Sequence, residues 1–206
     1  MRQYFGLVIV VFYMYGLLIW SAAKVKAQIA FDVVCPNVNI VQDFDMQKYS
    51  GVWFEIESYP DMINEFDICV SLSYSVQTDG VLQVVSSWFN TSSKAHESIQ
   101  GSARFVNPGL GAKLLVTYPT SFVTESMSTD GNFWIIETDY KNYAIVFLCL
   151  PIGPNISFQF LSYLSRERFP FTMGLNFVHQ RIETLGLDRT LLKPIDQTNC
   201  PSKAEK

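Results

Sequence analysis

Hydrophobic and polar residues alternate along much of the chain between residues 52 and 164. The clearest case is residues 69–76, where apolar side chains take every second position and serines take most of the positions between them. An alternation of period two with one polar face is typical of a half-buried strand in an antiparallel sheet. Asp79-Gly80 follows, a pair that favours a tight hairpin turn. The pattern therefore predicts a strand, a turn and a return strand over residues 81–89.

The same pattern recurs at fairly even intervals and predicts eight strands in all. The other six are expected at residues 52–58, 97–106, 113–117, 133–138, 143–149 and 157–164. The turn at residues 107–111 contains Gly-x-Gly, but a strand pattern follows it, whereas a phosphate-binding glycine loop opens a helix. Eight short antiparallel strands joined by hairpin turns fit an up-and-down barrel or a sandwich.

After the last strand, the apolar spacing changes to that of a helix. The positions that share one helical face are Phe171, Leu175, Val178, Ile182 and Leu185. This spacing predicts one amphipathic helix packed on the outside of the β-structure, ending at Gly186. Residues 187–206 show no regular pattern. The predicted fold class is therefore all-β, with one C-terminal α-helix.

The N-terminus reads differently from the rest of the chain. Arg2 precedes a charge-free run over residues 5–20, and small residues follow that run. This is the pattern of a secretory signal peptide, and the run is short for a membrane span, which needs about 20 apolar residues. The small residues permit cleavage after Ala23 or after Ala27. We expect residues 1–27 to be removed and residues 28–206 to form a single domain.

The charge balance and the cysteines agree with an exported protein. The chain has 15 basic and 19 acidic residues, and removal of residues 1–27 takes away three of the basic ones and none of the acidic ones. An acidic surface argues against nucleic acid and anionic membranes as partners. An even number of cysteines in an exported chain predicts two disulfides, and three pairings are open to Cys35, Cys69, Cys149 and Cys200.

Few residues suggest further chemistry. The sequons at Asn90 and Asn155 permit N-glycosylation. The two histidines, His96 and His179, are far from any cysteine pair and from any readable Ser/His/Asp set. The sequence therefore predicts neither a metal site nor a catalytic residue.

Three short motifs give the chain a family resemblance. They are DFDMQKYSGVWFEI at residues 43–56, ETDYKNY at residues 137–143 and LSR at residues 164–166. In this order, ahead of a helix, they resemble the three signatures of the lipocalin family, within the branch of apolipoprotein D, Lazarillo and the insect bilin-binding proteins. The tail DQTNCP at residues 196–201 supports that branch. The resemblance implies an eight-stranded antiparallel up-and-down lipocalin barrel with the helix packed outside.

The resemblance also assigns structural roles. It implies that Trp53 plugs the narrow end of the barrel, under a cation–π contact from Arg166, with Gly51 at the start of the first strand. It pairs Cys35 with Cys149 and Cys69 with Cys200. Strict alternation after Trp53 would bury two acids, so we expect a β-bulge directly after Trp53 that turns both outward, namely Glu55 and Glu57.

An eight-stranded barrel is just wide enough to hold one small ligand, and its inward apolar side chains should line the site. By alternation these are Val70, Leu72, Tyr74, Val84, Phe105, Leu114, Val116, Trp134 and Phe147. Trp134 also matches a pocket tryptophan of apolipoprotein D by its distance from Cys149, whereas Ser162 aligns with a pocket aromatic. Selectivity, and any contact with a lipid or receptor, should come from the mouth loops at residues 59–67, 90–96, 119–132 and 151–156.

The resemblance implies a secreted protein that binds and transports a fatty acid, a sterol or a related lipid, with no cofactor. One alternative is a carrier of a biliverdin-type pigment. An alternative of another class is a thiol-dependent isomerase that uses Cys69, as one lipocalin branch does. In a third hypothesis, the protein is a signalling or partner-binding protein whose cup is incidental.

Overall fold

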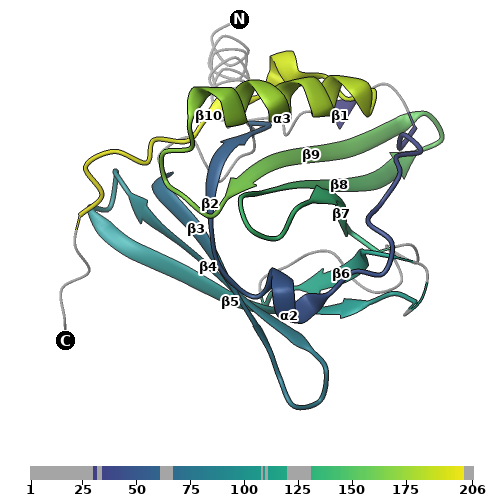
Figure 1. Cartoon of the computed structure of the whole chain (residues 1–206), viewed down its shortest axis with the longest axis horizontal. Helices are drawn as coiled ribbons and strands as arrows, with labels where there is room; N and C mark the ends of the chain where they lie inside the picture. The colour runs from purple at the N-terminus through teal and green to yellow at the C-terminus, as the bar shows by residue number, and fades with distance from the viewer. Residues whose placement is uncertain are drawn as a thin grey trace, which may run out of the picture.

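Eight strands curve round until the first pairs with the last, which closes a barrel (Figure 1). The computed structural model describes residues 30–31, 34–60, 67–107, 109, 111–119 and 131–201. The barrel strands are β2 (Gly51–Ser58), β3 (Asp67–Val76), β4 (Leu82–Asn90), β5 (Ala95–Phe105), β6 (Lys113–Thr117), β7 (Phe133–Thr138), β8 (Tyr143–Gly153) and β9 (Ile156–Ser165).

Each barrel strand pairs antiparallel with its neighbour in sequence, and β2 also pairs with β9. Two short strands extend the sheet outside the ring: β1 (Ala30–Phe31) on β9 and β10 (Lys193–Pro194) on β2. All eight predicted strands are present, and the predicted barrel is confirmed. The predicted signal peptide lies outside the described residues.

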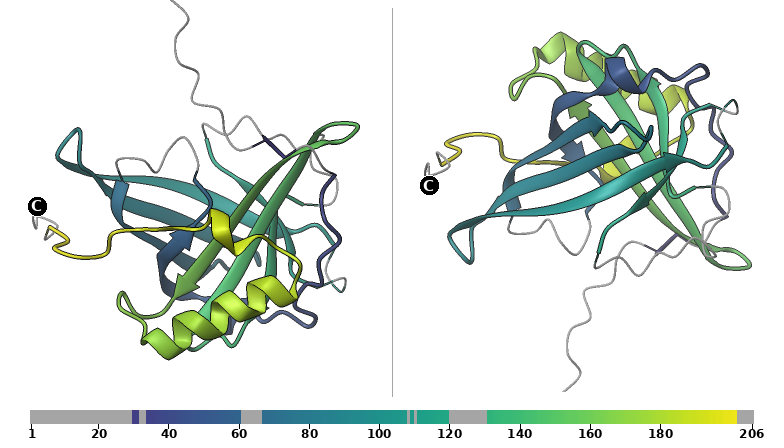
Figure 2. Two further views of the ribbon diagram at one scale, coloured as in Figure 1. Left: turned by 90° about the horizontal axis from the view of Figure 1, so that it is seen from above. Right: turned by 90° about the horizontal axis from the view of Figure 1, so that it is seen from below.

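The predicted C-terminal helix is α3 (Thr172–Thr184), which lies along the outside of the barrel (Figures 1 and 2). It buries Val178 and Ile182 against the sheet, and Gly186 follows it with a left-handed φ of 75°. A short helix, α2 (Met46–Tyr49), covers one end of the barrel, and a 3₁₀ turn, η3 (Arg189–Leu191), follows α3. Among the described residues, no helix has the length and apolar composition needed to cross a membrane.

The barrel wall separates two hydrophobic cores. The inner core contains Trp53 and Tyr74, together with Val146 of β8. The outer core lies between the sheet and α3 and contains Ile145 and Phe147, also of β8. Successive side chains of a strand point to opposite faces, so alternate residues of β8 belong to the inner and the outer core.

This alternation corrects two predicted ligand-site residues. Trp134 and Phe147 are register partners, their rings lie 5.9 Å apart, and both belong to the outer core with Val178 and Ile182 of α3. They therefore lie on the outer face of the barrel and not in its interior. The prediction was wrong because β7 and β8 are apolar on both faces, and an unbroken apolar run does not reveal which positions point inward.

The bulge in β2 also differs from its prediction. The register against β9 shifts between Glu55 and Glu57, two residues beyond Trp53. Glu57 is turned outward, as expected, and lies 2.6 Å from Nε2 of His179 on α3. Glu55, however, precedes the shift and is buried on the same face as Trp53, so the expectation that it points outward was wrong.

The C-terminal tail fills a split in the sheet. Strands β2 and β3 pair only as far as Phe54 and Ser71. Beyond that point, the side chain of Gln197 donates hydrogen bonds of 2.8 Å to the carbonyl oxygens of both Glu55 and Val70, which bridges the two strands. The backbone N–H of Cys69 donates to the carbonyl of Asp196 at 2.7 Å. A tail with no apolar periodicity thus supplies the hydrogen bonds that the separated strands would lack.

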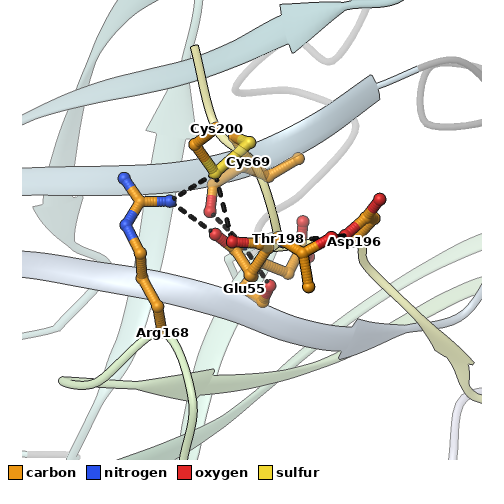
Figure 3. Close-up of a disulfide and its surroundings, with 8 residues drawn as sticks. Glu55, Cys69, Arg168, Asp196, Thr198 and Cys200 are labelled. Carbon is orange, nitrogen blue, oxygen red and sulfur yellow. Dashed lines mark hydrogen bonds between the residues drawn. A yellow bond between two sulfur atoms is a disulfide. The ribbon is translucent and has the colours of Figure 1, made fainter. Parts of the chain in front are cut away.

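Both disulfides join distant segments. Cys69 is bonded to Cys200, which fastens the tail beside the split (Figure 3). Cys35 is bonded to Cys149, which fastens the N-terminal arm to β8. These are the pairs that the family resemblance implies.

Candidate functional site

One end of the barrel is closed by a tryptophan beneath an arginine. The Trp53 side chain is fully buried, and its Nε1 donates to the carbonyl of Tyr49 at 2.9 Å. The Arg166 guanidinium lies 3.7 Å from the centre of the indole ring. The same guanidinium donates to four backbone carbonyls around α2, those of Lys48, Tyr49, Ser50 and Val52.

Gly51 makes this close approach possible. Its φ is 102°, in the left-handed region that side chains disfavour, and a Cβ at this position would lie 3.2 Å from Nη1 of Arg166. Arg166 also places its charge at the C-terminal end of α2, where a helix favours a cation. Gly51, Trp53 and Arg166 together seal the end of the barrel where α2 lies.

Most of the predicted ligand-site residues meet inside the barrel. The inner core includes Tyr74, Val84, Leu114 and Val116, and Leu72 and Phe105 pack against it. Val70 is buried beside the register shift in β3, near the tail, and is in neither core. The predicted set therefore divides into six residues that line the inner core, one at the split and two on the outer face.

The inner face becomes more exposed toward the end opposite Trp53. Strand pairing places further partly exposed side chains on that face, among them Trp88, Ile99, Leu148 and Phe160. The prediction missed them. Alternation onward from Val84 would have found Trp88, because the two residues are four positions apart in β4 and therefore share a face.

Polar groups interrupt this apolar surface at mid-height. The hydroxyl of Ser162 donates to the carboxylate of Glu55, and both are buried. The Tyr118 hydroxyl lies 3.1 Å from that of Ser86. The absence of a side chain at Gly101 leaves room for the Tyr118 ring, because a Cβ at position 101 would lie 2.6 Å from that ring.

The two phenols near Glu55 have raised pKa values. Burial is the largest cause of the raised pKa of both Tyr74 and Tyr118, and the negative charge of Glu55 adds to it in each case. Both phenols therefore stay protonated in neutral solution and keep their ability to donate a hydrogen bond.

Several predicted sites lie away from the interior or outside the described residues. Of the mouth loops, residues 61–66 and 120–130 are not described, and with them Met62, Ile63, Phe66, Phe122, Val123 and Met127. Asn155 is exposed at the tip of the β8–β9 hairpin, and the Asn90 side chain accepts bonds from the N–H groups of Ser92 and Ser93. Within the described ranges, no group of three His, Cys, Asp or Glu residues is placed to hold a metal ion.

Comparisons with known proteins agree with this architecture. A family model described as a lipocalin-like domain matches residues 44–153, more than half of the chain. Apolipoprotein D of Mus musculus is 26% identical over 167 residues, which cover 81% of this chain and 84% of that protein. The Lazarillo protein of Schistocerca americana is 29% identical over 180 residues, which cover 84% of this chain and 81% of that protein.

A solved structure shows the same fold. Insecticyanin from the tobacco hornworm Manduca sexta superposes with a TM-score of 0.68 at 21% identity, over 84% of this chain and 91% of that one. The branch that the three sequence motifs indicated is the branch of these relatives, so the resemblance is confirmed.

Proposed function

The chain belongs to the family of lipocalin-like domains, and on that premise we propose that it is an extracellular carrier of a small hydrophobic ligand, such as a fatty acid, a sterol or a related lipid. One observation carries the proposal. The inner face is mostly buried and apolar near Trp53, and it becomes partly exposed but stays largely apolar toward the opposite end. A barrel sealed at one end, with apolar walls at the other, suits a ligand that enters with its long axis along the barrel.

Export is supported by the cysteines. Both disulfides join segments more than 100 residues apart, and such bonds persist in oxidising compartments. The predicted signal peptide leads to the same compartment. We therefore place the protein outside the cell, where the sequons at Asn90 and Asn155 permit N-glycosylation.

The proposal describes a binding protein rather than an enzyme. The isomerase alternative requires a thiolate at Cys69, but the sulfur of Cys69 is bonded to that of Cys200. The pigment-carrier alternative uses the same barrel interior, so only the identity of the ligand separates it from the lipid-carrier proposal.

The test is to isolate the secreted protein under non-denaturing conditions and to identify co-purifying molecules by mass spectrometry. We expect a lipid at close to one molecule per protein. A visible absorption band from a stoichiometric tetrapyrrole would instead establish the pigment carrier.

A matched pair of variants tests where the ligand sits. Ile99→Glu places a charge on the inner face of β5, whereas Gln100→Glu places it one residue later on the exposed outer face. We expect Ile99→Glu to weaken binding of a fluorescent lipid at least tenfold, because a charge in an apolar site must be desolvated. Gln100→Glu should bind as the wild type does. Equal binding by all three proteins would contradict a site inside the barrel.

A further inference from the structure

Large apolar side chains are exposed on the outside of the molecule where α3 begins. Their exposed fractions are 64% at Phe169, 82% at Phe171, 83% at Met173 and 46% at Phe177. Met173 and Phe177 are four residues apart and therefore share one face of α3. Figure 2 shows α3 at the edge of the molecule, so this face is turned away from the barrel. We call Phe169, Phe171, Met173 and Phe177 the helix patch.

The helix patch is large enough to form the core of a protein–protein interface. An aromatic side chain can bury about 150–250 Å², so the three phenylalanines alone expose about 300–500 Å². Soluble monomers rarely expose an apolar patch larger than a few hundred Å². A stable homodimer buries about 800 Å² per partner, of which about 65% is apolar. The helix patch therefore supplies most of the apolar surface that a dimer of this chain needs.

A groove lies along α3 beside this patch. Its volume is about 450 Å³, and it is lined by Met173 and Phe177, by the amides of Asn176 and Gln180, and by the side chains of Glu183 and Arg189. Phe169 and Phe171 precede the helix and do not line the groove. The chain thus carries an exposed apolar segment and, along the helix that follows it, a groove with two apolar residues.

The charges of α3 are all paired with other elements. Arg181 bonds Glu137 of β7 at 2.8 Å, Glu183 bonds Arg189 of η3, and His179 bonds Glu57 of β2 at 2.6 Å. The helix contains no lysine. Helices that bind a lipid surface carry free lysines and arginines beside their apolar residues, whereas an interface between identical surfaces has to avoid unpaired like charges. The helix patch therefore suits a second copy of this chain better than a membrane.

We propose that two copies of the protein associate through α3, with the two helices antiparallel about a two-fold axis at the level of Leu175. This axis places Met173 of each copy against Phe177 of the other. It also brings Phe171 of each copy to the groove of the other, beside Gln180. Every contact then occurs twice, as in any two-fold interface. The interface lies outside the barrel, so it goes beyond the proposed carrier function and leaves the ligand site free.

Sedimentation velocity of the secreted protein, from about 1 to 200 µM, tests the proposal. We expect wild-type protein to form a dimer with a Kd in the micromolar range. Met173→Glu places a charge on each side of the axis and should raise that Kd at least a hundredfold. The variant should fold, because residue 173 is exposed and the first turn of a helix favours an acid. Wild-type protein that stays monomeric over this range would overturn the proposal.

Ile152→Glu is the matched control. Ile152 is 52% exposed and lies at the opposite end of β8 from Tyr143, whose ring contacts that of Phe177. The control makes the same change in charge and should dimerise as the wild type does. Added salt should tighten the wild-type dimer, because the interface is apolar and both copies carry the same net negative charge. A dimer that both variants abolish, or that salt weakens, would contradict an apolar interface at α3.

A mixture of two variants tests the antiparallel arrangement. Phe177→Lys and Met173→Glu in equal amounts should form a heterodimer at least tenfold more tightly than either variant pairs with itself, because one Met–Phe contact is replaced by a Lys–Glu pair. If Phe177→Lys does not fold, as judged by circular dichroism, Asn176→Lys replaces it, since Asn176 is exposed on the adjacent position. Failure to form the heterodimer would contradict this arrangement.

Two further measurements separate the occupants and the functions. Flotation with phosphatidylcholine vesicles tests a lipid surface: vesicle binding by monomeric wild-type protein that Met173→Glu abolishes would assign the helix patch to a membrane and overturn the proposal. Binding of a fluorescent lipid by Met173→Glu should equal that of wild type, because the interface lies outside the barrel. A protein that dimerises but binds no lipid would contradict the carrier function and leave this inference standing.

Discussion

The two sides of the barrel differ in how many of their faces are buried. Strands β3, β4 and β5 turn one face to the interior and the other to solvent, as the alternating exposure of Ser73, Tyr74 and Ser75 shows. Strands β7, β8 and β9 are covered on both faces, by the inner core and by α3. The first group will be called the open wall and the second the covered wall. The comparison indicates that the covered wall contributes more to stability, whereas both walls can contact a ligand.

The largest expected effect concerns the disulfide on the covered wall. The double substitution Cys35→Ser with Cys149→Ser removes a bond that spans 114 residues, and it should lower the free energy of unfolding by about 4–5 kcal/mol in the chain-entropy model. Guanidinium titration followed by tryptophan fluorescence measures this change. Lipid affinity should be unchanged in the folded fraction. A loss of less than about 1 kcal/mol would show that the arm does little to stabilise the wall.

The second effect separates stability from binding on the covered wall. Phe147→Ala leaves a cavity in the outer core and should cost about 3–5 kcal/mol of unfolding free energy. Affinity for a lipid should not change, since the side chain lies in the outer core. Urea unfolding and probe displacement on the same sample measure the two quantities. Ser73→Ala, on the exposed face of the open wall, is the control and should stay within about 0.5 kcal/mol of wild type. Weaker lipid binding by Phe147→Ala would show that the Phe147 side chain contacts the ligand.

The smallest effect lies at the edge of the open wall. Gln197→Ala leaves the carbonyl oxygens of Glu55 and Val70 without the donors that bridge them, and should cost about 1–3 kcal/mol. Hydrogen exchange should speed up locally in β2 and β3 near the split while the other strands keep their protection. Uniform acceleration across the barrel would indicate that the tail stabilises the whole fold instead.

The same difference between the walls explains which inward-facing residues could be predicted from the sequence. On the open wall, alternation places Leu72, Tyr74 and Val84 on the inner face, where the structure has them. On the covered wall, β8 is apolar at almost every position, so the pattern identified a strand but not its orientation, and Phe147 was assigned to the wrong face.

Two further features had no usable signal in the sequence. The position of a β-bulge depends on the hydrogen-bond register between β2 and β9, so the sequence suggested a bulge but not that it follows Glu55. The burial of Glu55 on the inner face was missed for that reason. The tail beyond Leu187 has no period, and its pairing with β2 and β3 depends on a few backbone hydrogen bonds, one glutamine and one disulfide. The irregular segment expected there is, in the structure, part of the wall.

The bond between Cys69 and Cys200 can form only late in biosynthesis. The two cysteines are 131 residues apart, and a ribosome adds roughly 5–20 residues per second, so Cys69 waits on the order of 7–26 s for its partner to be made. Before Cys200 is made, Cys35 and Cys69, and later Cys149, can exchange with one another. The last cysteine to emerge is the one that locks the tail into the split. Yield in a secretory pathway should therefore depend on a disulfide isomerase that keeps the early thiols from pairing wrongly.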